Sequence, residues 1–132
     1  MRALVTGAAG FVGRHLIDHL TAEGDEVTET DRTAGGADLL DAPGLDREIA
    51  TASPEVIFHL AGQADVGASW TDATGTLRVN AEGTLNLLSS ARAHGVRRVV
   101  TVSSADLYGI VTPGDLPLDE ASPLRPVSPY GA

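Results

Sequence analysis

Cysteine is absent from the sequence, and this absence removes two classes of site. Without a thiol the chain can form neither a disulfide framework nor a thiolate metal centre, and the composition suits a reducing compartment. Three of the four histidines, His15, His19 and His94, fall on expected helices or at their ends, with no carboxylate at metal-ligand spacing. We therefore expect no bound metal.

Positive charge is also scarce, because nine basic residues stand against 18 acidic ones and the net charge is −9. Such a chain repels phosphate backbones and anionic membranes, so we expect no nucleic-acid partner. The sequence has no signal-peptide core and no run near the ~20 apolar residues of a membrane span. These absences predict a soluble, cytoplasmic protein without a membrane partner, and its length suits one domain.

What the sequence does contain is a regular alternation of short apolar runs with segments of helical period. The runs expected to form strands are residues 3–5, 26–30, 36–40, 56–61 and 98–102. The fourth is apolar almost throughout, which is typical of a parallel strand covered on both faces. The alternation predicts an α/β fold, a Rossmann-type doubly wound parallel sheet with helices on both faces, truncated after the fifth strand.

Apolar residues at helical spacing indicate two helices. The first ends at Gly24, and its stripe is Val12, Leu16 and Leu20. The second is long and ends at Gly95, and its stripe is Leu77, Ala81, Leu85 and Leu88. Beyond Ser104 a proline-rich loop covers residues 113–126, and Ser128 is the expected start of a further helix.

The first expected strand runs directly into TGAAGFVG, a turn with glycines three residues apart. Gly7 allows a tight turn, and Gly10 lets the main chain approach a pyrophosphate at the helix N-terminus, where Phe11 and Val12 begin the helix. Gly13 lets helix and strand pack closely. The spacing differs by one residue from G-x-G-x-x-G, and an ordinary glycine-rich turn is the alternative. The strand before it and the helix after it favour nucleotide binding.

Asp31 ends the second expected strand, eighteen positions after Gly13. A carboxylate at this place typically accepts hydrogen bonds from the adenine ribose, which favours NAD over NADP. Arg32 follows directly, and a guanidinium there could meet a 2′-phosphate. The alternative is that Arg32 is a solvated surface cation, so the cofactor is expected to be NAD, with NADP possible.

Six blocks occur in a fixed order: TGAAGFVG, ADLLD, HLAGQADVGASW, NAEGTLNLL, VSSADLYG and SPYGA. In this order and spacing the chain resembles the N-terminal part of an extended short-chain dehydrogenase/reductase, the family of NAD(P)-dependent nucleotide-sugar epimerases and dehydratases. The resemblance covers essentially the whole chain. It implies a nucleotide-sugar substrate, hydride transfer to and from the sugar, and a parent protein that is a homodimer.

By this resemblance Asp38 and Leu39 contact the adenine edge, although Asp38 could instead be a turn cap. Other residues would pass beneath or hold the cofactor: Leu60, Ala61, Gly62, Asn80, Ser103 and Tyr130. Gly62 departs from the alanine more usual in the family, which should loosen the turn. Asn80 could instead bond a neighbouring helix carbonyl. His59, in the buried fourth strand, is interpreted as a satisfied core residue rather than a catalytic one.

The resemblance places the chemistry on Ser104 and Tyr130, twenty-six residues apart. Ser104 would hydrogen-bond the sugar oxygen, and Tyr130 would exchange the proton on it. A free phenol has a pKa of ~10 and needs a nearby cation to act as a base near neutrality. The family supplies a lysine four residues after the tyrosine, and this position lies beyond Ala132.

Asp106 could narrow the reaction further. Related 4,6-dehydratases carry an acid two residues after the Ser/Thr, but usually glutamate, and related reductases also carry an acid there. A carboxylate that caps a turn is the alternative. The stretch from Leu116 to Pro126, together with HLAGQADVGASW, is most similar to GDP-mannose 4,6-dehydratases and GDP-4-keto-6-deoxyhexose reductases.

The interrupted tyrosine motif is interpreted as a sign that the chain is a piece of a longer protein. We expect the isolated 132 residues to leave the fifth strand as an open edge, to be marginal or self-associating, and to be inactive. A non-catalytic NAD(P)-binding module, or an inactive truncated gene product, is the alternative to an oxidoreductase.

Overall fold

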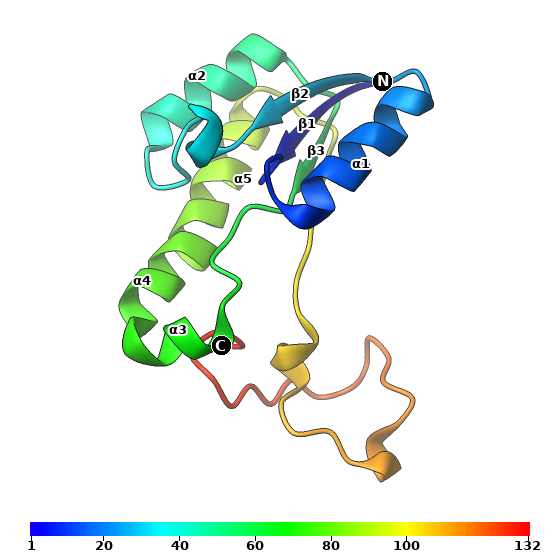
Figure 1. Cartoon of the computed structure of the whole chain (residues 1–132), viewed down its shortest axis with the longest axis vertical. Helices are drawn as coiled ribbons and strands as arrows, with labels where there is room; N and C mark the ends of the chain where they lie inside the picture. Colours follow the sequence, from blue (N-terminus) through cyan, green and yellow to red (C-terminus); the bar gives the residue numbers. More distant parts are fainter. The chain divides into compact units, whose positions relative to one another are not determined.

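A computed structural model describes all residues, 1–132. The chain forms two compact units, which can be followed by colour in Figure 1. Unit 1 consists of Met1–Gly62 and Arg78–Val102, and unit 2 of Gln63–Leu77 and Ser103–Ala132.

Unit 1 is built on a four-stranded sheet in the order β2-β1-β3-β4, with every neighbouring pair parallel. The strands are β1 (Arg2–Thr6), β2 (Glu26–Thr30), β3 (Val56–His59) and β4 (Arg98–Thr101). Thr6 pairs with Thr30 on one side and with His59 on the other, so the carboxyl ends of the three strands lie level. In a sheet of this kind that edge is where ligands bind.

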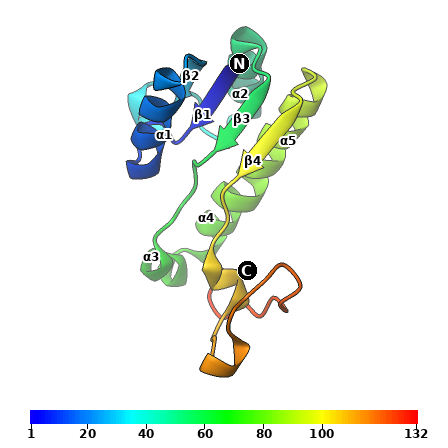
Figure 2. The ribbon, with the colours of Figure 1, turned by 90° about the vertical axis from the view of Figure 1, so that its right-hand side faces the viewer.

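Helices cover both faces of this sheet: α1 (Phe11–Ala22) on one, and α2 (Ala42–Ala52) with α5 (Gly83–Ala93) on the other (Figures 1 and 2). The alternation of side chains along β1 explains this, since successive residues of a strand face opposite sides. Leu4 lies in a core cluster with Leu45, Ile49, Ile57 and Leu87, whereas Ala3 and Val5 pack with Leu20 of α1. The prediction of a doubly wound, Rossmann-type sheet is confirmed.

The third expected strand, residues 36–40, is wrong, because these residues are irregular and end in a turn at Leu39 and Leu40. The 3-10 turn η1 (Arg32–Ala34) follows β2 almost at once, and Asp41 already caps α2. In addition, the N–H of Ala37 donates to the side chain of Glu48. In a strand this N–H would donate to the main chain of the neighbouring strand. β2 pairs only with β1 and is therefore an edge strand of the sheet.

The long second helix of the sequence prediction consists of three consecutive elements, and its apolar stripe is not the face that is buried. α4 (Ala73–Leu77), a π-helical turn η2 (Arg78–Glu82) and α5 follow one another in the sequence. Leu85 and Leu88, which belong to the apolar stripe that indicated this helix, are 63% and 43% exposed. The buried face of α5 instead consists of Gly83, Leu87, Ser90 and Ala91. Small residues share this face with Leu87 where the helix lies close to its neighbours: a Cβ on Gly83 would be 2.7 Å from Cβ of Leu39.

Unit 2 contains two short helices, α3 (Val66–Thr71) and α4, and two 3-10 turns, η3 (Ala105–Tyr108) and η4 (Pro113–Asp115), within an irregular proline-rich loop. The helix expected from Ser128 is not formed. Ser128 Oγ accepts the N–H of Gly131 at 3.1 Å and closes a turn instead.

Candidate functional site

The glycine turn between β1 and α1 leaves no room for side chains at two of its three glycines. Gly7 has a φ of +70°, and a Cβ there would be 2.8 Å from the Ala61 nitrogen. A Cβ on Gly13 would overlap the Gly7 carbonyl oxygen. Gly10 is more open, because a Cβ there would lie 3.1 Å from the same Gly7 oxygen. The turn therefore presents bare main chain at the carboxyl end of β1.

The N-terminus of α1 carries amide groups that no side chain caps, because the N-cap residue is Gly10. The first N–H groups of a helix have no partner within the helix, and the helix dipole favours negative charge beside them. The side chain of Phe11 points to solvent, with 82% of the residue exposed. The amides of Phe11, Val12 and Gly13 are thus suited to a phosphate or pyrophosphate.

Asp31 is tied to this turn. Its Oδ2 accepts the N–H of Ala9 at 3.2 Å, and its Oδ1 accepts both the N–H of Thr33 at 2.8 Å and the Thr33 hydroxyl at 2.6 Å. The Thr33 hydroxyl, more than any other group, holds the pKa of Asp31 below its usual range. The sequence prediction did not include Thr33, although an aspartate side chain commonly accepts the main-chain N–H two residues further on.

Arg32 and Asp38, both assigned to the cofactor site from the sequence, form an ion pair with each other at 3.3 Å. Asp38 also accepts the N–H of Leu40 at 2.9 Å, so the turn-cap role left open above does occur. Leu39 is only 8% exposed, with its side chain in the core and its carbonyl bonded to Asn86 Nδ2 at 2.9 Å. Any adenine contact from Leu39 would have to come from its main-chain amide.

At the end of β3, the main chain of Leu60 and Ala61 is anchored to β1. Their N–H groups both donate to Thr6 Oγ1 at 3.2 Å. His59 is 2% exposed and hydrogen-bonded at both ring nitrogens, which confirms it as a satisfied core residue. A Cβ on Gly62 would lie 3.1 Å from Asn80 Oδ1, so the glycine at this position leaves room for the asparagine.

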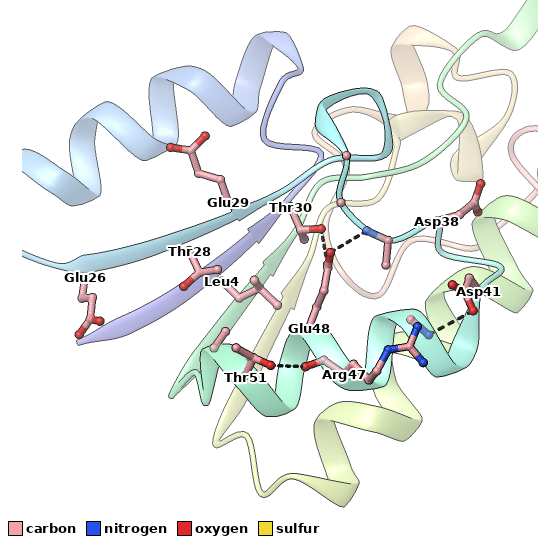
Figure 3. A pocket seen from close by; sticks show the side chains of 15 residues that line it. Leu4, Glu26, Thr28, Glu29, Thr30, Asp38, Asp41, Arg47, Glu48 and Thr51 are labelled. Carbon is pink, nitrogen blue, oxygen red and sulfur yellow. Dashed lines mark hydrogen bonds between the residues drawn. The ribbon is translucent and has the colours of Figure 1, made fainter.

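A groove of about 690 Å³ runs along the edge strand β2 beside α2 (Figure 3). In Figure 3 Glu48 extends from α2 toward the end of β2, where it accepts the Thr30 hydroxyl and the Ala37 N–H. The lining carries several carboxylates and one cation, Arg47. Because these carboxylates would repel phosphate groups, the groove is a poor site for a dinucleotide.

Unit 2 holds the residues assigned to chemistry. Ser104 caps η3, and its Oγ accepts the Asp106 N–H at 3.1 Å. A Cβ on Gly131 would lie 2.8 Å from the Asp106 carbonyl oxygen, so the main chain next to Tyr130 packs on the turn that carries Ser104 and Asp106. The Tyr130 side chain is half-buried, and Ser103 is exposed.

No group of three or more His, Asp or Glu side chains is arranged to hold a metal ion. None of the helices is long and apolar enough to cross a membrane.

A doubly wound parallel sheet, a glycine turn opening onto an uncapped helix N-terminus and an acid at the end of the second strand define a class, the dinucleotide-binding α/β proteins. Their donors and acceptors fit a pyrophosphate and a ribose. The pattern of the NAD dependent epimerase/dehydratase family matches residues 3–132. The chain belongs to this family.

Its relatives include several kinds of nucleotide-sugar enzyme. The UDP-glucose 4-epimerase of Mycolicibacterium smegmatis is 42% identical over 151 residues, which cover 100% of this chain and 47% of that protein. The GDP-6-deoxy-D-mannose reductase of Pseudomonas aeruginosa is 36% identical over 130 residues, which cover 98% of this chain and 42% of that protein.

Solved structures agree with this assignment. UDP-glucose 4-epimerase of Thermus thermophilus, in complex with NAD, has a TM-score of 0.91 and 38% identity over 99% of this chain and 46% of that one. RMD from Pseudomonas aeruginosa, complexed with NADPH, has a TM-score of 0.83 and 34% identity over 99% and 45%. The chain spans about half the length of the proteins it matches.

Proposed function

We propose that this chain binds NAD and forms the cofactor-binding part of an oxidoreductase that acts on a nucleotide sugar in the manner of epimerases and dehydratases. The observation that carries the proposal is the geometry around the glycine turn. Bare main chain at Gly7 and Gly10 meets the free amides of α1, and Asp31 is bonded to Ala9 in the same turn. Pyrophosphate at the amides and ribose at the carboxylate would bind side by side.

NAD is the better fit than NADP for two reasons. The Asp31 carboxylate has an acceptor position left on Oδ2 for a ribose hydroxyl, but its negative charge would repel a 2′-phosphate. Arg32 is already paired with Asp38, and would have to leave that partner to reach a 2′-phosphate. We keep NADP as the weaker ligand.

For the chemistry, Ser104 and Tyr130 would act on the same sugar oxygen. Bound NAD would supply the hydride acceptor. Ser104 Oγ accepts the Asp106 N–H, so its own O–H is available to donate to a sugar oxygen. The Tyr130 hydroxyl would exchange a proton with that oxygen, and it needs a neighbouring cation to do so near neutrality. All nine basic residues of the chain are arginines, so it has no lysine for this task.

We further propose a GDP-linked sugar and a dehydratase or 4-keto reductase reaction. Two observations support this choice: Asp106 two residues after Ser104, and an alignment to the GDP-6-deoxy-D-mannose reductase no longer than the chain. The alignment to the UDP-glucose 4-epimerase is longer than the chain, so that relative carries residues without a counterpart here. The sequence identity to the UDP-glucose 4-epimerase is higher, 42% against 36%, so the assays include a UDP-linked as well as a GDP-linked sugar.

The first test is the chain itself, assayed with UDP-glucose, dTDP-glucose and a GDP-linked 4-keto-6-deoxyhexose. We expect NAD binding and no turnover from the chain, and the same result is expected of the second candidate, a non-catalytic NAD-binding module. In a longer polypeptide containing these residues, Ser104→Ala and Tyr130→Phe should each lower kcat by about 10²- to 10⁴-fold. Unchanged kcat in both variants would refute the oxidoreductase role.

A further inference from the structure

A buried histidine joins three elements of unit 1 at the carboxyl edge of the sheet. His59, the last residue of β3, receives a hydrogen bond at Nδ1 from Thr6 of β1, with 2.7 Å between Nδ1 and Oγ1. Its Nε2 lies 3.0 Å from Thr84 Oγ1 of α5. The ring therefore bridges the strand that leads into the glycine turn and the helix that follows Asn80.

The neighbouring bonds fix the direction of every hydrogen in this relay. Thr84 Oγ1 lies 2.6 Å from the Asn80 carbonyl, which can only accept, so the Thr84 hydroxyl donates there. Toward His59 the hydroxyl can then only accept, and the proton must be on Nε2. Burial lowers the pKa of His59, in agreement with a neutral ring. Nδ1 is left to accept from the Thr6 hydroxyl.

Both ends of the relay reach the same stretch of main chain. Thr6 Oγ1 uses its lone pairs to accept the N–H groups of Leu60 and Ala61, and this peptide lies against Gly7. At the other end, the Asn80 carbonyl is held within the π-helical turn η2. The side chain of Asn80 comes back to Gly62. Single π-turns in helices frequently mark functional sites.

We propose that His59 is a positioning residue for the cofactor: as the Nε2–H tautomer, relayed through Thr6 and Thr84, it sets the Leu60–Gly62 main chain against the glycine turn. This inference rests on the proposed function, since it assigns the relay to cofactor binding rather than to core stability. Protonation of the ring would break the relay, because Thr6 Oγ1 already accepts two N–H groups and has no place for a third donor. Removal of the ring would take away the acceptor of the Thr6 hydroxyl.

The first test is spectroscopic and needs no ligand. Long-range ¹H–¹⁵N spectra of the ¹⁵N-labelled chain at pH 7 identify which ring nitrogen of each histidine carries the proton, and His59→Gln assigns the signal. We expect His59 to be neutral with the proton on Nε2. A proton on Nδ1, or a charged ring at pH 7, would refute the relay whatever the chain binds.

The second test separates positioning from packing with two variants on the same helix. Thr84→Val removes the relay hydroxyl at nearly constant volume. Ser90→Ala removes another buried hydroxyl of α5, which bonds Asp46 on α2 and takes no part in the relay. Both should lower the melting temperature. Only Thr84→Val should weaken NAD binding, by about tenfold, the size of one lost buried hydrogen bond.

A conservative substitution of His59 should keep part of the relay. His59→Gln keeps a donor on the Thr84 side and should retain more NAD affinity than His59→Leu, which keeps neither bond. Equal NAD affinity in wild type, Thr84→Val and His59→Leu would show that the relay only stabilises the core. If the folded wild type binds no NAD, the proposed function fails and the cofactor role of the relay with it, although the tautomer result still stands.

Discussion

At the scale of single residues, position 13 is the most constrained in the glycine turn. Its missing side chain would meet two carbonyl oxygens of the main chain, that of Gly7 and, at 2.7 Å, that of Ala8. Neither atom is the flexible end of a side chain, so any Cβ forces the turn open. The geometry that places free amides beside bare main chain depends on this close packing.

Gly13→Ala should therefore abolish measurable NAD binding and destabilise the fold by about 1–3 kcal/mol through overpacking. Gly114→Ala is the matched control, because a Cβ there meets only Thr112 Oγ1 at 3.8 Å, an ordinary contact. Chemical denaturation and calorimetric titration measure the two effects. Wild-type NAD affinity in Gly13→Ala would contradict the account of the turn.

The hydrogen bonds of Asp31 make the stability of the fold depend on pH. Its pKa is lowered in the folded chain, mainly by the Thr33 hydroxyl, so the charged form contributes stability at every pH above the unfolded value of ~3.9. That contribution is lost as the pH falls through the folded pKa. The difference in melting temperature between wild type and Asp31→Asn should stay constant from pH 8 to about 5 and shrink below about 4. A difference that already shrinks between pH 7 and 5 would show that Asp31 is not held in this way.

At the scale of elements, the sequence predicted the first helix because a glycine-rich turn precedes it and its apolar residues recur at helical spacing. It also predicted the strands that are short apolar runs. It did not predict α2, although Asp41 as N-cap and Pro43 in the first turn were visible signals. The prediction of a third strand was wrong because Asp38 caps a turn at Leu40 and Asp41 caps α2, so the ADLLD segment is not extended. The buried face of α5 was missed because small residues, not large apolar ones, make the closest contacts.

The corrected face of α5 is tested by two leucines on the same helix. Leu87 is fully buried among the core residues of unit 1, and Leu87→Ala should cost about 2–5 kcal/mol of unfolding free energy. Leu85 points outward, and Leu85→Ala should change stability by no more than about 0.5 kcal/mol. Denaturant unfolding of both variants measures the two free energies. A larger loss of stability in Leu85→Ala than in Leu87→Ala would contradict the buried face observed in the structure.

At the scale of the whole molecule, the sheet of unit 1 ends in two open strands. The edge strand β2 carries Glu26 and Glu29, charges of the kind that discourage pairing with another chain. β4 carries Val99 and Val100, and Val100 is 39% exposed. β4 is the last strand in the order β2-β1-β3-β4, so the main-chain groups on its outer side are open to pairing with another strand.

We therefore predict that the isolated chain self-associates through β4. Sedimentation at rising protein concentration should show reversible oligomers, and Val100→Lys should shift them toward monomer. Leu85→Lys, a charge placed on the outer face of α5, is the control. Loss of association with Leu85→Lys but not with Val100→Lys would place the contact on the helix, and a monomer at all concentrations would remove the prediction.

The most direct test of the account is calorimetric titration of the folded chain with NAD and NADP, repeated on Asp31→Ala. The wild type should prefer NAD, and Asp31→Ala should weaken NAD binding about ten- to a hundredfold, the size of a lost charged hydrogen bond. Circular dichroism confirms that both proteins are folded. If the folded wild type binds neither cofactor, the glycine turn is structural in this chain and the central claim is wrong.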